Sequence, residues 1–144
     1  MDAIEDKIKV KRAKESKLNN VNWDTLGFGK VFSDHIFVAD YKNGNWQEGH
    51  ILPYGEMAIE PTMCTLHYGQ TIFEGLKAYN DISGGINIFR PDRNAKRFNN
   101  SATRLVMPNF PEERFLEAVS ELVSLEKDWI PKQRGQALYI RPVM

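Results

Sequence analysis

This sequence has a single cysteine, and it has neither a long apolar run nor a recognisable targeting segment. Its one cysteine, Cys64, has no second cysteine in the chain with which to form a disulfide. No apolar run reaches the roughly 18 residues that a membrane-spanning helix requires. Residues 1–12 mix acidic and basic side chains, whereas a signal peptide has an apolar core and a transit peptide is poor in acids. We therefore expect a reduced, soluble protein in the cytoplasm, without a membrane partner.

The sequence also has no net charge. Lysine and arginine together number 19, as do aspartate and glutamate, so the formal charge is zero. Such a chain has no overall electrostatic field that would attract nucleic acid or an anionic membrane. The three histidines, His35, His50 and His67, are too scattered to suggest a metal site, and no glycine-rich phosphate loop is present. We expect neither a metal nor nucleic acid as a partner.

The size of the chain predicts one domain with a short extension. With 144 residues, of which 42% are hydrophobic, the chain can bury one core. Residues 1–24 mix both charges with few apolar side chains and are predicted to form a flexible arm. Residues 25–144 are predicted to form a small domain. Because the chain stops at Met144 directly after a strand-like segment, we expect it to be truncated before a further domain.

Short runs of β-branched and aromatic residues between turn residues predict an antiparallel sheet. The expected strands are residues 31–41, 49–54, 77–79, 86–89 and 137–141. The first two form a hairpin through the Asn43-Gly44 turn. One helix is expected from Pro91 until Pro108 ends it, and a second from Pro111 to Trp129. The predicted fold class is α+β, with helices packed on an antiparallel sheet.

Tyr139 and Arg141 are two residues apart on the last expected strand, so their side chains project from the same face. A guanidinium offers a planar fork to a carboxylate, and a tyrosine hydroxyl can donate a further hydrogen bond. The pair therefore suits a carboxylate ligand. A strand with one solvent-facing side would also carry these residue types, so that reading stays open.

The first expected helix is locally basic, because Arg90, Arg93, Lys96, Arg97 and Arg104 stand against the single acid Asp92. A guanidinium on a rigid helix can hold a phosphate in a fixed orientation. A solvated helix face and contact with nucleic-acid phosphates are the alternative interpretations.

A third candidate region lies between Gly69 and Gly75, whose backbone freedom would aim His67, Tyr68 and Phe73. The plainer interpretations are a structural histidine and a core phenylalanine.

Phe28, between two glycines, is either a pocket wall or a loop anchor. Cys64 is expected to be buried and inert.

Three motifs stand here in one order: HYGxxxFEGxKAY within residues 66–79, RPxxNxxRxxxSAxRLxxP from residue 90, and YIRP within residues 138–142. With them the chain resembles the N-terminal part of the branched-chain amino acid aminotransferases, which are fold type IV pyridoxal-phosphate enzymes. The likeness covers residues 26–144, and residues 29–35 match the family's opening strand.

The resemblance implies a role for five residues. Arg97 would grip the phosphate of pyridoxal phosphate, and Phe28, Tyr68, Tyr139 and Arg141 would line the substrate pocket. Its aromatic walls would accept the side chain of Leu, Ile or Val, and Tyr68 and Arg141 would accept the distal carboxylate of glutamate, whose partner acid is 2-oxoglutarate. The family's enzymes are homodimers, which implies a homodimer here.

The lysine that binds the cofactor covalently in this family lies in a larger C-terminal domain, and neither Lys77 nor Lys96 matches it. The resemblance thus implies no catalytic residue within these 144 residues, an isolated chain that is inactive, and weak or absent cofactor binding. Two fold type IV relatives, D-amino-acid aminotransferase and aminodeoxychorismate lyase, are alternatives. A non-catalytic module that dimerises or binds a partner is another.

Overall fold

The structure, a computed structural model, describes residues 8–144 and divides the chain into two compact units. The first unit contains the described residues up to Gly55 together with Ala118–Trp129, and the second contains Glu56–Glu117 together with Ile130–Met144. The division into an arm of residues 1–24 and a small domain of residues 25–144 stays a prediction. In the described part of the chain, no helix is both long and apolar enough to cross a membrane.

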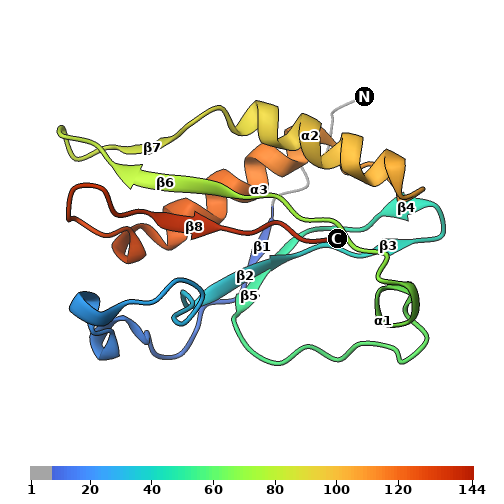
Figure 1. Cartoon of the computed structure of the whole chain (residues 1–144). Coiled ribbons are helices and arrows are strands. Elements are labelled where there is room, and N and C mark those ends of the chain that lie inside the picture. Colours follow the sequence, from blue (N-terminus) through green and yellow to red (C-terminus); the bar gives the residue numbers. More distant parts are fainter. Residues whose placement is uncertain (1–7) are drawn as a thin grey trace. The chain divides into compact units, whose positions relative to one another are not determined.

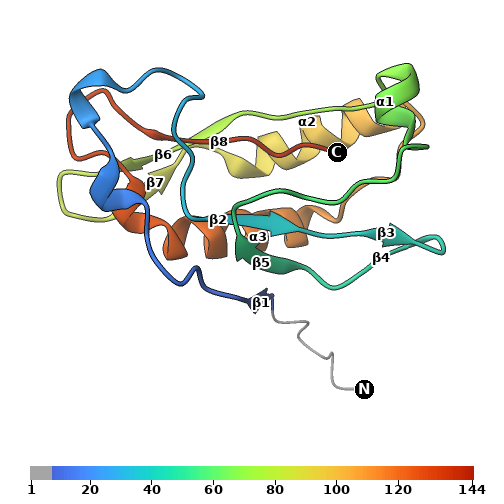
Figure 2. The ribbon, with the colours of Figure 1, turned by 90° about the horizontal axis from the view of Figure 1, so that it is seen from below.

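The first unit contains a three-stranded sheet with the order β1-β5-β2, in which β1 is Lys9–Val10, β5 is His50–Pro53 and β2 is His35–Val38. Strand β2 pairs antiparallel with β5, whereas β1 pairs parallel with it (Figures 1 and 2). The central strand carries Ile51, which is fully buried. The predicted pairing of two antiparallel strands is therefore present, with a parallel strand added beside them.

A small hairpin connects β2 to β5. Strands β3, Tyr41–Lys42, and β4, Asn45–Trp46, pair across the turn, where Asn43 and Gly44 have φ angles of 52° and 78°. Both angles lie in the left-handed region that a tight hairpin turn demands, and Asn-Gly is the pair that adopts it most readily. The predicted turn is confirmed. The first strand, expected from residue 31, begins only at His35.

Val31 and Phe32 lie in a loop before β2, outside the sheet. There the Phe32 ring stacks on the ring of Tyr54, with 5.0 Å between the ring centroids. Residues 8–24 also make contacts that the sequence did not predict for a loose arm. Besides β1 they form two short 3₁₀ helices, η1 at Leu18–Asn20 and η2 at Trp23–Thr25. The first seven residues of the predicted arm lie outside the described residues.

The second unit contains a three-stranded antiparallel sheet with the order β7-β6-β8. Its strands are Ile86–Ile88, Leu76–Asn80 and Leu138–Ile140, respectively. The three strands predicted for this part of the chain are thus confirmed: β6 is one residue longer at each end than predicted, β7 is one residue shorter, and β8 is one residue shorter at each end. Strand β6 lies in the middle, so its Ala78 is fully buried.

Helix α2, Pro91–Arg104, lies along this sheet (Figure 1). Proline at the first helical position suits its start, because the missing N–H would have no partner there. Ala95, Phe98 and Ala102 form the buried stripe of the helix, whereas Leu105, at the next position of this apolar spacing, follows the helix and is exposed.

Two further helices complete the described elements. Helix α3, Glu112–Leu125, followed by η3, Lys127–Trp129, corresponds to the second predicted helix. Helix α1, Cys64–Tyr68, was not predicted, and it ends at Gly69, whose φ of 62° lies in the left-handed region. Small antiparallel pairings combined with helices confirm the α+β class.

Candidate functional site

The chain before β6 continues the sheet and sorts its side chains onto two faces. Ile72, Glu74, Leu76 and Ala78 are buried, while the residues between them are not. Backbone hydrogen bonds from Ile72 to Met144 and from Glu74 to Pro142 keep this segment paired with the chain after β8. Because side chains alternate along a strand, the odd-numbered residues share the opposite face. We call the face that carries Phe73, Gly75, Tyr139 and Arg141 the open face.

On the open face, Arg141 lies between two aromatic rings. Its guanidinium carbon is 4.4 Å from the centroid of Phe73 and 5.1 Å from that of Tyr139. Contacts of this kind between a cation and a π-system stabilise the charge beside the rings and do not by themselves use its N–H donors. The structure thus brings Tyr139 and Arg141 together and adds Phe73. Phe73 is 61% exposed, so the interpretation of this residue as core is wrong.

Gly75 permits this cluster because it has no side chain. A Cβ atom on Gly75 would lie 3.0 Å from Cζ of Tyr139, well inside van der Waals contact. Sequence reasoning attributed both Gly69 and Gly75 to backbone conformation, and only Gly69 has a positive φ. Gly75 is instead required by the close approach of the tyrosine ring.

On the buried face, Glu74 holds Arg97. Arg97 donates from Nε to Glu74 Oε1 at 2.6 Å and from Nη2 to Oε2 at 2.8 Å, and Asn94 Nδ2 donates to Oε2 at 2.8 Å. Burial alone would raise the pKa of Glu74, but the hydrogen bonds and the charge of Arg97 outweigh it and hold this pKa below its usual value. Glu74 is therefore ionised at neutral pH.

Arg97 is consequently not on the open face. Asn94 also donates to the backbone carbonyl of Gly75 at 3.2 Å, on the strand edge that β7, paired only with residues 78–80, leaves uncovered. The anchor of Arg97 is thus one residue away in sequence from both Phe73 and Gly75. In the tripeptide 73–75, the side chain of Glu74 binds Arg97 on one side of the backbone. Phe73 and Gly75 belong to the open face on the other side.

For the other two predicted pocket residues, Tyr68 and Phe28, the structure shows the surroundings of each one separately. Tyr68 ends helix α1 with its side chain exposed and has a tilted ring contact with His67 at 6.2 Å. His67 itself has a hydrogen-bond contact with the Pro61 carbonyl at 2.6 Å, which fits a structural histidine. Phe28 belongs to the first unit and is exposed. Cys64 is exposed rather than buried, because it begins α1 on the outside of the unit.

The first unit contains a buried polar cluster that sequence reasoning missed. Asp34 accepts hydrogen bonds from Ser16 Oγ at 2.5 Å, the Lys17 backbone N–H at 2.9 Å and Trp129 Nε1 at 3.0 Å. Burial would raise the pKa of Asp34, yet these hydrogen bonds lower it below its usual value. Glu126 is also buried; it accepts from the Asp34 backbone N–H at 2.7 Å and contacts His35 Nδ1.

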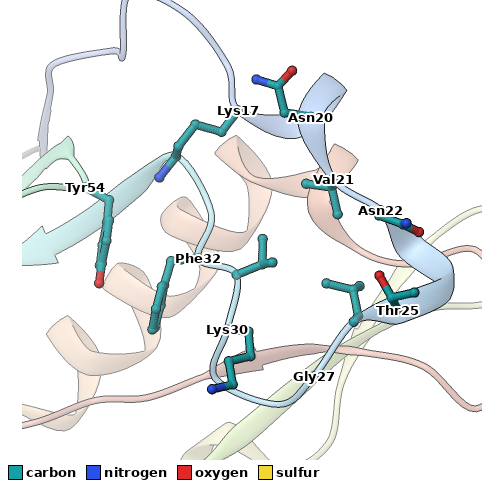
Figure 3. Close-up of a pocket in the computed structure, with 11 residues that line it drawn as sticks. Lys17, Asn20, Val21, Asn22, Thr25, Gly27, Lys30, Phe32 and Tyr54 are labelled. Atoms are coloured by element: carbon teal, nitrogen blue, oxygen red, sulfur yellow. The ribbon is translucent and has the colours of Figure 1, made fainter.

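A shallow cavity of about 480 Å³ also lies in the first unit (Figure 3). Lys17, Lys30, Phe32 and Tyr54 are among its lining residues, and Lys17 Nζ lies 4.9 Å from the centroid of the Tyr54 ring. None of the five residues predicted to bind cofactor or substrate lines this cavity.

No protein-family model matches the chain. In sequence it is 50% identical over 119 residues to branched-chain-amino-acid transaminase 1 of Bacillus subtilis (strain 168), an alignment that covers 82% of this chain and 33% of that protein. It is 46% identical over 136 residues to a probable branched-chain-amino-acid aminotransferase of Staphylococcus aureus (strain N315), covering 94% of this chain and 37% of that protein. The chain belongs to the branched-chain-amino-acid aminotransferase family.

Its structure agrees with this branched-chain aminotransferase assignment. The crystal structure of a T.th. branched-chain amino acid aminotransferase complexed with N-(5'-phosphopyridoxyl)-L-glutamate matches with a TM-score of 0.54 and 35% identity, covering 65% of this chain and 29% of that one. The resemblance drawn from the three motifs is thus confirmed. The chain spans about a third of the length of the curated relatives it matches.

Proposed function

We propose that this chain supplies part of the cofactor and substrate site of an enzyme that transfers the amino group of Leu, Ile or Val to 2-oxoglutarate through pyridoxal phosphate. The observation that carries the proposal is the open-face cluster, in which Arg141 lies between Phe73 and Tyr139. Phe73 of this cluster is followed in the chain by Glu74, which accepts hydrogen bonds from the guanidinium of Arg97. An anion-binding group and a mixed aromatic and cationic wall are therefore joined by one short segment.

Arg97 is the residue that would hold the cofactor phosphate. Its side chain is 67% exposed although two of its donors are bonded to Glu74, so the rest of the guanidinium faces outward, where an anion could reach it. A related structure contains a phosphopyridoxyl group linked to glutamate, which supports this chemistry in the family. Pyridoxal phosphate, when bound, supplies the carbonyl carbon that accepts and releases the amino group.

The open face would bind the substrates. The rings of Phe73 and Tyr139 offer apolar surface to a branched aliphatic side chain, and the edge of the Arg141 guanidinium offers hydrogen bonds to the distal carboxylate of 2-oxoglutarate. Phe28 and Tyr68 are proposed as further walls on the strength of the family motifs. One surface would thus accept both an apolar and an acidic substrate.

We infer that the 144-residue chain is inactive by itself, because no lysine in it matches the family's cofactor lysine. Self-association is proposed as well, in the form of a cytoplasmic homodimer. Exposed apolar side chains support it: Phe73, Val106 and Val143 are 61%, 90% and 63% exposed. A strictly monomeric species in light scattering at high protein concentration would count against this part.

The test is an assay of the full-length protein, as its gene encodes it, with leucine, 2-oxoglutarate and pyridoxal phosphate, in which glutamate formation is measured. Arg141→Leu keeps an apolar side chain on the open face but removes the charged donors, so KM for 2-oxoglutarate should rise by about tenfold or more while KM for leucine changes little. Arg93→Leu, an exposed change on α2, is the matched control and should alter neither. Activity confined to D-alanine would contradict the proposal.

A further inference from the structure

The ion pair between Glu74 and Arg97 joins a buried acid to an exposed base. Glu74 is 3% exposed, whereas the Arg97 side chain is 67% exposed. A buried carboxylate is unfavourable unless its oxygens are fully hydrogen-bonded. Here Oε1 accepts from Arg97 Nε, and Oε2 accepts from both Arg97 Nη2 and Asn94 Nδ2. Two residues of α2, three positions apart, thus provide hydrogen-bond donors to both oxygens of the acid.

This arrangement fixes the part of Arg97 that Glu74 does not touch. A guanidinium has five N–H donors in a rigid plane. Glu74 takes the Nε hydrogen and one hydrogen of Nη2, so the remaining three, one on Nη2 and two on Nη1, point away from it. Because the group is planar, holding one edge fixes the direction of the other. The exposed edge of Arg97 is therefore oriented before any ligand arrives.

Stability alone is a weak explanation for Glu74. Ion pairs at exposed sites contribute little, and replacing a buried pair by apolar residues is often neutral or stabilising. Glu74 also brings a negative charge next to the cation, which by itself would weaken attraction for an anion. An acid at this position is useful to an anion site only if the orientation of the guanidinium matters more than the net charge.

We propose that Glu74 is a positioning residue for anion binding: together with Asn94 it holds Arg97 so that the outer edge of the guanidinium is presented to a phosphate group. The inference rests on the proposed function, in which Arg97 contacts the cofactor phosphate. Glu74 does not touch the phosphate itself. Its contribution is to order the arginine side chain during folding, so that this ordering does not have to occur on binding.

Orientation and charge predict opposite results for Glu74→Gln. The substitution removes the negative charge, so a purely electrostatic view predicts tighter phosphate binding. It also places an amide NH₂ group against a guanidinium donor, so only one of the two bonds from Arg97 can remain and the planar fork is lost. The positioning view therefore predicts weaker binding, by about five- to tenfold, as expected when a rotamer-rich side chain must be ordered on binding.

The experiment measures the affinity of the full-length protein, stripped of cofactor, for pyridoxal phosphate and for pyridoxal, by quenching of tryptophan fluorescence. Pyridoxal lacks the phosphate, so the ratio of the two affinities isolates the phosphate contact. Glu74→Gln should lower this ratio about five- to tenfold and leave pyridoxal binding unchanged. Asp92→Asn is the matched control: it removes an exposed carboxylate from the same helix without touching Arg97, and should not lower the ratio.

The possible results separate the inference from the proposed function. An unchanged or raised ratio in Glu74→Gln, with a lowered ratio in Arg97→Ala, overturns the positioning role and leaves the phosphate role of Arg97 standing. An unchanged ratio in Arg97→Ala overturns both. Equal weakening of both ligands in Glu74→Gln indicates a structural role only and also overturns the inference. If Glu74→Gln does not fold, Asn94→Ala replaces it and should lower the ratio about threefold, because one of the bonds that hold Glu74 is lost.

Discussion

Replacing Asp34 with alanine is expected to destabilise the protein by about 3 kcal/mol. The Asp34 carboxylate is 7% exposed and accepts hydrogen bonds from Ser16, Lys17 and Trp129. Alanine removes the acceptor but leaves the donors in place. Leaving the indole N–H of the buried Trp129 without an acceptor costs about 2 kcal/mol of folding stability. Leaving the less buried Lys17 backbone N–H without one costs about 1 kcal/mol. The Ser16 hydroxyl can turn toward water, so it adds little.

Urea denaturation followed by tryptophan fluorescence measures this loss, because Trp129 lies within the cluster. Asp40→Ala is the matched control, since Asp40 is an exposed aspartate paired with the equally exposed Lys42. Its effect should stay within about 0.5 kcal/mol. A loss below about 1 kcal/mol in Asp34→Ala would show that the donors find other partners easily. It would refute the view that this carboxylate holds the segment around Ser16 and Lys17.

Two further predictions concern acid and packing. Because hydrogen bonds hold the pKa of Asp34 and Glu74 below their ordinary values of 3.8 and 4.5, the stability they contribute is present above those values and is lost as pH falls through the lower folded-state pKa values. The urea concentration at the unfolding midpoint should therefore decrease as the pH is lowered below about 4, and it should decrease less in Asp34→Asn. A midpoint concentration that stays constant down to about pH 2 would contradict this. Gly75→Ala should destabilise by about 1–3 kcal/mol because its Cβ meets the Tyr139 ring. Gly55→Ala, where no atom lies within 4 Å, is the control, and equal unfolding midpoints for the two variants would refute the steric argument.

Local patterns predicted the elements whose signals lie within a few residues. The Asn43-Gly44 turn and the start of α2 at Pro91 follow from backbone preferences of single residues, so they could be read directly. Helix α1 was missed because five residues are too few to show a helical period. The exposed Leu105 continues the apolar spacing of α2, yet the helix has already ended before it. Spacing predicts which face a residue would share, but not where the helix stops.

The polar clusters depend on partners that are distant in sequence. Trp129 Nε1 and Asp34 are 95 positions apart, and Arg97 and Glu74 are 23 apart, so no local pattern relates them. Family motifs pointed to Arg97, Tyr139 and Arg141 but did not show that Glu74 would take two donors of the first. Phe73 was interpreted as core because aromatic residues are usually buried. Strand alternation with the apolar Ile72, Leu76 and Ala78 would have placed it on the opposite face.

The carboxylate of Asp34 has a consequence for how this region can change over evolutionary time. It binds the backbone of Lys17, 17 positions earlier, so the two ends of the segment between these residues are held close together. Between these two residues lies a surface loop that carries Phe28 and contributes no strand to the sheet. The closure entropy of such a loop rises only slowly with length, by about 0.6 kcal/mol for each doubling. We infer that insertions here could reshape a wall of the proposed substrate pocket while strand pairing is conserved.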